Sequence, residues 1–179
     1  MTLILIQSIC SGIGAESNRA EIDLSRIDPQ IAAPHQVDNV HAISELAGTP
    51  IDMVVIGTCT NGRLKDLQQA AGLLDKHRKA AGVELLVVPA SRRIYRRAAE
   101  QGLLEILSRN GALILPPGCG PCCGSSAGIP GDGKNVLSTA NRNFLGRMGN
   151  VNAGIYLGSP PAAAAAAVSG KITDPRGMP

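Results

Sequence analysis

The sequence is poor in aromatic residues: its 179 residues include no Trp, two Tyr and one Phe. Proteins that bind single-stranded nucleic acid stack bases on aromatic side chains, so this scarcity argues against that class of function. The net charge of +3 is also well short of a DNA-binding pattern, although it suits an acidic small molecule as ligand. The core must therefore consist of Leu, Ile, Val and Ala, which favours buried parallel strands covered by helices of small residues.

Long apolar runs are missing as well, so we expect no membrane-spanning segment. Residues 1–10 are apolar but lack the basic start of a signal peptide. The five cysteines are an odd number, and without an export signal they favour a reducing compartment over a disulfide framework. We therefore predict a cytoplasmic protein in which clustered cysteines serve as metal ligands or redox groups.

From residue 51 onward, short β-branched runs alternate with helical patterns. Apolar spacing predicts a helix over 64–74 with Asn61 as its N-cap, and a second helix that opens at Ser91 and keeps one apolar face as far as Leu103. A third, alanine-rich helix follows Pro160-Pro161. The alternation predicts an α/β fold with a mostly parallel sheet flanked by helices. The expected strands lie at residues 51–57, 84–89, 112–115, 135–138 and 154–157.

The beginning of the chain departs from this pattern. We interpret residues 1–20 as an atypical N-terminal arm, in which Cys10 is a bystander, and residues 21–179 as one α/β domain. Pro29 and Pro34 exclude a continuous helix between residues 21 and 50, so an extended segment along the surface is expected there. His35 and His41 in that segment are interpreted as hydrogen-bonded surface groups rather than as metal ligands.

Three cysteines stand in two glycine-rich stretches. Cys59 follows the expected strand 51–57, and Cys119 and Cys122 follow the expected strand 112–115. Because the loops after parallel strands gather at one edge of a sheet, these thiols are expected to share that edge. Three thiolates can hold a metal centre and leave one position open, as a catalytic metal requires. The spacing alone leaves open an iron–sulfur cluster, a zinc site and inert buried thiols.

The neighbouring Cys123 is not expected to be a ligand, because side chains of adjacent residues tend to point apart.

Asn141, Arg142 and Arg147 follow the strand 135–138, and planar guanidinium groups bind carboxylates through paired hydrogen bonds. The alternative for this stretch is a surface loop with two solvated arginines. The arginines between residues 92 and 97 are interpreted as a solvated helix face. The glycine-rich stretch 128–135 is interpreted as a turn, since no strand precedes it and no helix follows it.

Three ordered motifs then resemble the aconitase superfamily: IGTCTNGR at 56–63, GCGPC at 118–122 and STANRNFLGR at 138–147. The sequence is most similar to the large subunits of 3-isopropylmalate dehydratase and homoaconitase, from about Glu21 to the end. The resemblance includes the helix that Ser159 opens and the closing TDPR at 173–176. Two departures are the additional thiol of Cys123 and Ala140, where serine or threonine is more usual.

The resemblance implies a three-layer fold like the third domain of aconitase, and a [4Fe–4S] cluster ligated by Cys59, Cys119 and Cys122. The iron without a protein ligand would act as a Lewis acid on a hydroxy-polycarboxylate. The reaction implied is dehydration and rehydration of an acid of the 3-isopropylmalate or homocitrate type, as in leucine biosynthesis. The residues implied beside the cluster are Asn141 and Asn61, and those implied to bind substrate carboxylates are Arg142 and Arg147.

The resemblance covers only the last, cluster-bearing domain of such a large subunit. No catalytic acid or base is identified in this chain, because the family carries its histidine–aspartate group in earlier domains and its serine base in a swivelling domain or small subunit. Those missing large-subunit domains and the small subunit are the expected partners, together with a possible homo-oligomer, and the chain alone is expected to be inactive. The alternatives are a metal-free α/β domain that self-associates without catalysis, or a zinc-binding interaction module.

Overall fold

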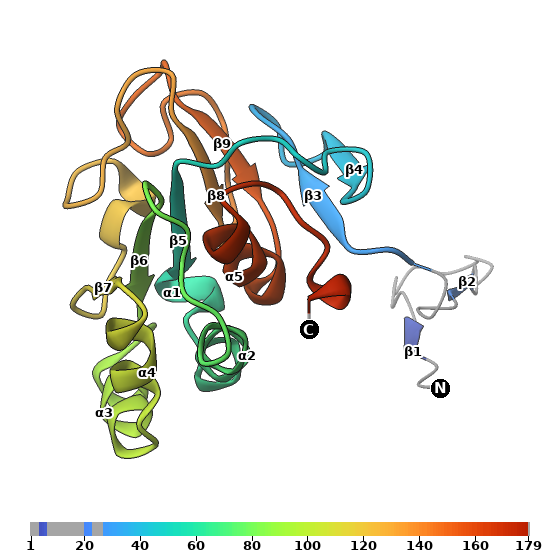
Figure 1. Cartoon of the computed structure of the whole chain (residues 1–179). Helices are drawn as coiled ribbons and strands as arrows, with labels where there is room; N and C mark the ends of the chain where they lie inside the picture. Colours follow the sequence, from blue (N-terminus) through green and yellow to red (C-terminus); the bar gives the residue numbers. More distant parts are fainter. Residues whose placement is uncertain (1–3, 7–19, 23–26, 179) are drawn as a thin grey trace, which may run out of the picture.

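The computed structural model describes residues 4–6, 20–22 and 27–178 (Figure 1). A seven-stranded sheet has the order β4-β3-β9-β8-β5-β6-β7, and its last five strands run parallel. The prediction of a mostly parallel α/β sheet is therefore confirmed, and two strands match the expected bounds at both ends, β8 and β9. The parallel strands are β5 (Met53–Gly57), β6 (Glu84–Val88), β7 (Ala112–Ile114), β8 (Asn135–Ser138) and β9 (Gly154–Leu157).

The segment 27–50 is not simply an extended surface segment, so that expectation was wrong in part. Strands β3 (Gln30–Ala32) and β4 (Val40–Ala42) form an antiparallel hairpin that joins the sheet where Ala32 pairs with Leu157 of β9. Ile31 in β3 is fully buried. His41 in β4 lies 3.1 Å from the carboxylate of Glu45, as expected of a surface histidine.

Helices cover one face of the sheet. Helices α2 (Leu64–Leu74), α4 (Leu103–Arg109) and α5 (Pro160–Ser169) pack in sequence across it, and Figure 1 shows α5 in front of β8 and β9. Ser159 opens α5 by accepting a hydrogen bond from the Ala162 amide, and the alanines 162–167 of this helix are all buried. Small side chains allow a helix to lie close to β-branched strands, as the composition predicted.

Two helix boundaries differ from the expectation. Arg63, not Asn61, precedes α2, and its backbone amide donates to the carboxylate of Asp66, which stabilises the first turn. Asn61 instead ends the short helix α1 (Thr58–Asn61). The helix that begins after Ser91 stops at residue 100, because Gly102 takes a left-handed conformation that separates α3 (Arg92–Glu100) from α4.

Strand residues alternate between the two faces of the sheet. Val54, Ile56, Leu85 and Val87 point into the helix-covered core, whereas a smaller second core faces the other way. Two residues from loops complete that second core, Leu115 and Met148. The loops 115–134 and 139–153 thus cover this face in the described part of the chain, and they carry most of the candidate site. We call it the loop face.

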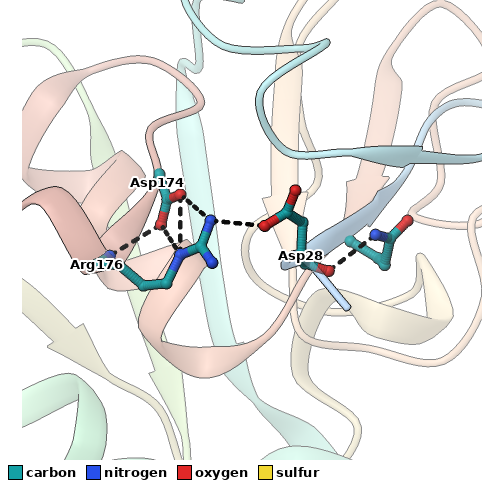
Figure 2. Close-up of polar contacts among 4 residues, drawn as sticks. Asp28, Asp174 and Arg176 are labelled. Carbon is teal, nitrogen blue, oxygen red and sulfur yellow. Dashed lines mark hydrogen bonds and ion pairs between the residues drawn. The ribbon is translucent and has the colours of Figure 1, made fainter. Parts of the chain in front are cut away.

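The end of the chain is fastened to the start of the β3 hairpin. Figure 2 shows the guanidinium group of Arg176 between two carboxylates, with Nη2 lying 3.0 Å from Asp28 and 2.7 Å from Asp174. The hydrogen bonds from Arg176 lower the pKa of Asp174 below its usual value. The closing TDPR motif therefore has a structural role here, because it links the C-terminal segment to the antiparallel edge of the sheet.

At the N-terminus, β1 (Ile4–Ile6) pairs antiparallel with β2 (Ala20–Ile22). The predicted division after residue 20 falls within β2 and stays a prediction, and Cys10 lies outside the described residues. Among the helices that the structure describes, none has both the length and the apolar character needed to cross a membrane.

Candidate metal centre

Cys59 lies in α1, at the point where β5 leaves the sheet. Hydrogen bonds to Thr139 link this turn to the loop that follows β8. The Gly57 amide donates to Oγ1 of Thr139 at 2.8 Å, and Nδ2 of Asn61 donates to the Thr139 carbonyl at 2.5 Å. Cys59 itself is exposed. The first thiol is therefore presented at the carboxyl edge of the sheet, beside the loop that contains the candidate arginines.

Cys119 and Cys122 lie in the loop after β7, where a single 3₁₀ turn spans Gly120–Cys123. The Cys122 side chain is buried, whereas the thiols of Cys119 and Cys123 are exposed. Cys123 therefore differs from its neighbour in its surroundings. The Ser125 hydroxyl, 3.1 Å from the Cys123 sulfur, lowers the pKa of that thiol.

The loop that contains Cys119 and Cys122 (the cysteine loop) and the loop that contains Arg142 and Arg147 (the arginine loop) meet at two glycines. Gly124 and Gly149 both have positive φ angles, and a Cβ atom added to Gly124 would lie 2.4 Å from the Gly149 amide nitrogen. Beside this contact, Nη2 of Arg147 lies 3.5 Å from the Cys122 sulfur, and its guanidinium carbon lies 5.5 Å from the centre of the Phe144 ring. The structure thus brings Arg147 to the second thiol loop, because only glycines permit so close a backbone approach.

Four buried side-chain atoms lack a hydrogen-bond partner in the described residues, and three of them adjoin the candidate thiols. They are Oγ1 of Thr58 and Thr60, on either side of Cys59, and Nε of Arg147, beside Cys122. Buried donors are nearly always paired in folded proteins. These atoms are therefore available to donate to an acceptor that is not part of the chain. Bridging sulfides of an iron–sulfur cluster accept such bonds, so the residues present fit that group.

The described residues contain no group of three or more His, Cys, Asp or Glu side chains that could hold a single metal ion. A single zinc ion draws its ligands to one point, and this convergence is not seen. A cubane cluster takes each thiolate on a different iron, so its ligands stand further apart than those of one ion. The described geometry therefore does not bring the three thiols together as ligands of one ion, and the group that these loops would hold stays a prediction.

Arg142 lies apart from Arg147. Its Nη1 atom donates to the Asn141 carbonyl at 2.6 Å, and its side chain lines a hollow formed with residues 35–38. Phe144 lines the same hollow and lies under Arg147, so it separates the two arginines. The expected pair of carboxylate-binding arginines is therefore spread over two adjacent places.

The sequence interpretation missed Asn143. This side chain is fully buried, and its Nδ2 atom donates to the carbonyls of Ala33 at 2.8 Å, Ile155 at 3.2 Å and Gln36 at 3.3 Å. It stands inside the motif at 138–147, but nothing in that motif indicates that its amide reaches back more than a hundred residues. The arginines of α3 are exposed, and Arg96 pairs with Glu100 at 3.3 Å, as expected of a solvated helix face.

Comparison with known proteins agrees with these motifs. The model of the aconitase family (aconitate hydratase) matches residues 44–170, which is most of the chain. The chain belongs to the aconitase family. It is 55% identical to the 3-isopropylmalate dehydratase large subunit 1 of Thermotoga maritima and 52% identical to that of Archaeoglobus fulgidus, over 87% and 90% of this chain. It is also 48% identical, over 86% of its length, to the methanogen homoaconitase large subunit of Methanocaldococcus jannaschii.

This aconitase-family chain spans only part of its relatives' length. It covers 38% and 39% of the two dehydratase subunits and 37% of the homoaconitase subunit.

Proposed function

We propose that this chain is the cluster-bearing domain of a hydro-lyase that dehydrates and rehydrates a hydroxy-polycarboxylic acid. In this proposal Cys59, Cys119 and Cys122 hold a [4Fe–4S] cluster in a reducing cytoplasm. The observation that carries it is the junction of three loops, in which the Thr139 bonds, the Gly124–Gly149 contact and the Arg147–Cys122 contact join both thiol loops to the arginine loop. When bound, the cluster would supply a Lewis-acidic iron for the substrate hydroxyl and carboxylate.

In this proposal the chain's own residues bind and orient the substrate. Arg147 holds its guanidinium group between Phe144 and Cys122, where it can donate both to a thiolate and to a substrate carboxylate. Arg142 has donors left for a second carboxylate, since within the described residues its side chain donates only to the neighbouring carbonyl. Asn61 and Asn141 flank the cluster in this proposal, and Asn61 keeps the Cys59 turn attached to Thr139.

The proton transfers need groups from elsewhere. The relatives are named large subunits, so we infer that a small subunit and the remaining large-subunit domains complete the site. The substrate would be of the 3-isopropylmalate or homoaconitate type that the relatives' names indicate, and the pathway that of leucine or a related amino acid. Two arginines and an open iron cannot by themselves remove and return a proton, so we expect no turnover by the chain alone.

Anaerobic reconstitution with iron and sulfide tests this function. We expect about four irons per chain and a visible charge-transfer absorbance. Cys59→Ser should remove most of both signals, whereas the matched variant Cys123→Ser should retain them because Cys123 is not a ligand. An unchanged spectrum in Cys59→Ser would contradict the ligand assignment.

A second candidate is a metal-free domain that self-associates through the loop face. Three apolar side chains there are about half exposed: Ile129 at 47%, Leu145 at 56% and Val151 at 58%. Exposed apolar groups of this kind drive association. A stable dimer mass in size-exclusion chromatography, without iron uptake, would favour this candidate, and stoichiometric zinc under the same conditions would favour a zinc-binding module.

A further inference from the structure

Helix α3 carries four arginines in its nine residues, at positions 92, 93, 96 and 97. Two of them stand in the first turn, where the aligned peptide dipoles of a helix favour anions and disfavour cations, and that turn contains no acidic residue. Arg96 stands four residues after Arg92 and three after Arg93, so their like charges repel one another on the helix surface. The stability of the helix therefore gains nothing from this arrangement.

Neighbouring side chains neutralise little of this charge. Arg96 lies 3.3 Å from the carboxylate of Glu100, whereas the side chains of Arg92 and Arg93 make no hydrogen bond or ion pair within the described residues. Both side chains are exposed. An anion at this turn would be stabilised by the guanidinium groups and by the amide groups at the start of the helix.

A hollow of about 440 Å³ opens at these arginines, and Arg92, Arg93 and Arg96 line it. We call it the cationic hollow. Phosphate groups suit such a lining, because the planar guanidinium group donates paired hydrogen bonds to phosphate oxygens. Its volume is also within the usual range of small-molecule sites, about 300–1,000 Å³.

A second hollow, of about 470 Å³, shares Arg92 with the first. Its other lining residues are Tyr95 of α3, Ile114 of β7, and Pro116 and Pro117 after that strand. We call it the apolar hollow. The Tyr95 side chain is 39% exposed, so part of its ring is free to contact a ligand. Both α3 and the two prolines follow parallel strands, at the edge of the sheet where α/β proteins bind ligands.

We propose that the two hollows together bind a nucleoside polyphosphate, with the base in the apolar hollow and the phosphates in the cationic hollow. The base stacks on Tyr95, and Arg92, which lines both hollows, binds the phosphate nearest the sugar. Among the described residues no cysteine lines either hollow, so this site is separate from the candidate metal centre. Pro117 stands two residues before Cys119, so a bound nucleotide contacts the segment that leads into the cysteine loop.

Isothermal titration of the full chain tests the proposal, with ATP, AMP and tripolyphosphate as probes and with EDTA present. We expect ATP to bind about tenfold more tightly than tripolyphosphate, because only ATP has a base to stack on Tyr95. ATP should also bind about tenfold more tightly than AMP, which brings fewer phosphate oxygens to the arginines.

Variants separate the two hollows. Tyr95→Ala should abolish the preference for ATP over tripolyphosphate and leave tripolyphosphate binding unchanged. Arg93→Gln should weaken both ligands alike by about tenfold, because it removes a charge-assisted hydrogen bond to phosphate. The matched control Arg97→Gln removes the same charge from the same helix but lines neither hollow. In about 0.15 M salt, which screens exposed charges beyond about 8 Å, it should change either affinity less than about twofold.

The proposal is overturned if ATP does not bind at millimolar concentration, if tripolyphosphate binds as tightly as ATP, or if the preference for ATP survives Tyr95→Ala. It is also overturned if Arg97→Gln loses as much affinity as Arg93→Gln, because α3 would then attract any polyanion without a defined site. Partial unfolding of Tyr95→Ala would weaken both ligands and would not imitate the loss of preference. Iron uptake by the cysteines is measured separately, so its failure would leave this inference standing.

Discussion

The two faces of the sheet are built in different ways. On the helix-covered face, strand residues pack against α2, α4 and α5 in one large core that includes five buried alanines of α5, at positions 162, 163, 164, 166 and 167. On the loop face, the second core is smaller, and Leu115 and Met148 are its members from outside the strands. Apolar burial is the main source of folding stability, so we expect most of this protein's stability to reside on the helix-covered side.

The loop face holds most of the candidate site. The buried thiol of Cys122 and the Arg147 guanidinium group belong to its loops, and within the described residues the buried Nε of Arg147 has no hydrogen-bond partner. Groups that must meet a ligand cannot also be fully paired with one another. A rigid scaffold on one side therefore supports loops on the other side whose bonds are left incomplete.

The largest effect is expected from a cavity in the helix-covered core. Leu74 at the end of α2 is fully buried, so Leu74→Ala should lower the free energy of unfolding by about 3 kcal/mol, measured by urea denaturation. The neighbouring Leu73 is only partly buried, and Leu73→Ala should cost less than half as much. Equal losses from the two variants would mean that depth of burial does not determine stability on this face.

A smaller loss is expected where the cysteine and arginine loops meet. Gly124→Ala adds a Cβ atom 2.4 Å from the Gly149 amide nitrogen, at a positive φ angle, and should destabilise the protein by about 2 kcal/mol. Gly133 is the control, since its φ of 69° is nearly the same and its Cβ position is open. Gly133→Ala should cost about 1 kcal/mol, from backbone strain alone.

If the two glycine variants lose the same stability in thermal or urea unfolding, the close contact contributes nothing. The junction of the two loops would then be loose, and the loop face less organised than its hydrogen bonds indicate. A larger loss in Gly124→Ala would instead establish that the site is assembled by backbone contact.

The parallel strands were predictable because each is a short apolar run bounded by turn residues, so local pattern and tertiary fold agree. Strand β8, for example, lies between the turn ending at Lys134 and the buried Thr139. The same agreement predicted that Cys59 and Cys119 would both follow parallel strands. The thiol ligand set and the roles of the arginines stay predictions, because sequence spacing specifies an edge of the sheet but no distance across it.

The features that were missed depend on distant partners. Strands β3 and β4 have three residues each, and β3 is a strand because β9 lies beside it, more than a hundred residues further along the chain. The N-cap was misassigned because the Asn61 amide bonds to Thr139 in another loop instead of to its own helix. The contacts of Asn143 and the hollow beside it could not be predicted for the same reason, since both form only where residues 33–38 meet the arginine loop.

A moderate effect is expected from Asn143→Ala. This change leaves the buried carbonyls of Ala33 and Ile155 without this donor, and should lower the free energy of unfolding by about 1.5 kcal/mol. Amide hydrogen exchange should quicken in residues 33–38 and remain unchanged in α2. The exposed Asn141 makes no side-chain hydrogen bond within the described residues, so Asn141→Ala should have no measurable effect on either quantity.

The smallest effect concerns the ion pair that fastens the loop 115–134 to the opposite edge of the sheet. Nζ of Lys134 lies 2.9 Å from Asp52, whose carboxylate also accepts a bond from the Asn135 amide. Both hydrogen bonds lower the pKa of Asp52, and the one from Lys134 has the larger effect. Because the folded-state pKa is lowered, the stabilisation is complete above the unfolded value of about 3.9 and disappears as the pH falls through the lowered folded value.

Half of the Lys134 side chain is exposed, so solvent screens the pair and its contribution to stability at neutral pH should be small. Lys134→Met should show this small loss at pH 7 and should converge with the parent chain in acid, as Asp52 becomes protonated, in urea titrations at each pH. The hydrogen bond from the Asn135 amide to Asp52 remains in this variant, so the stability of the variant still depends on pH. A constant difference between the two proteins down to pH 2 would mean that the lysine acts through the packing of its methylene groups, and that the loop face gains no stability from charge at this edge.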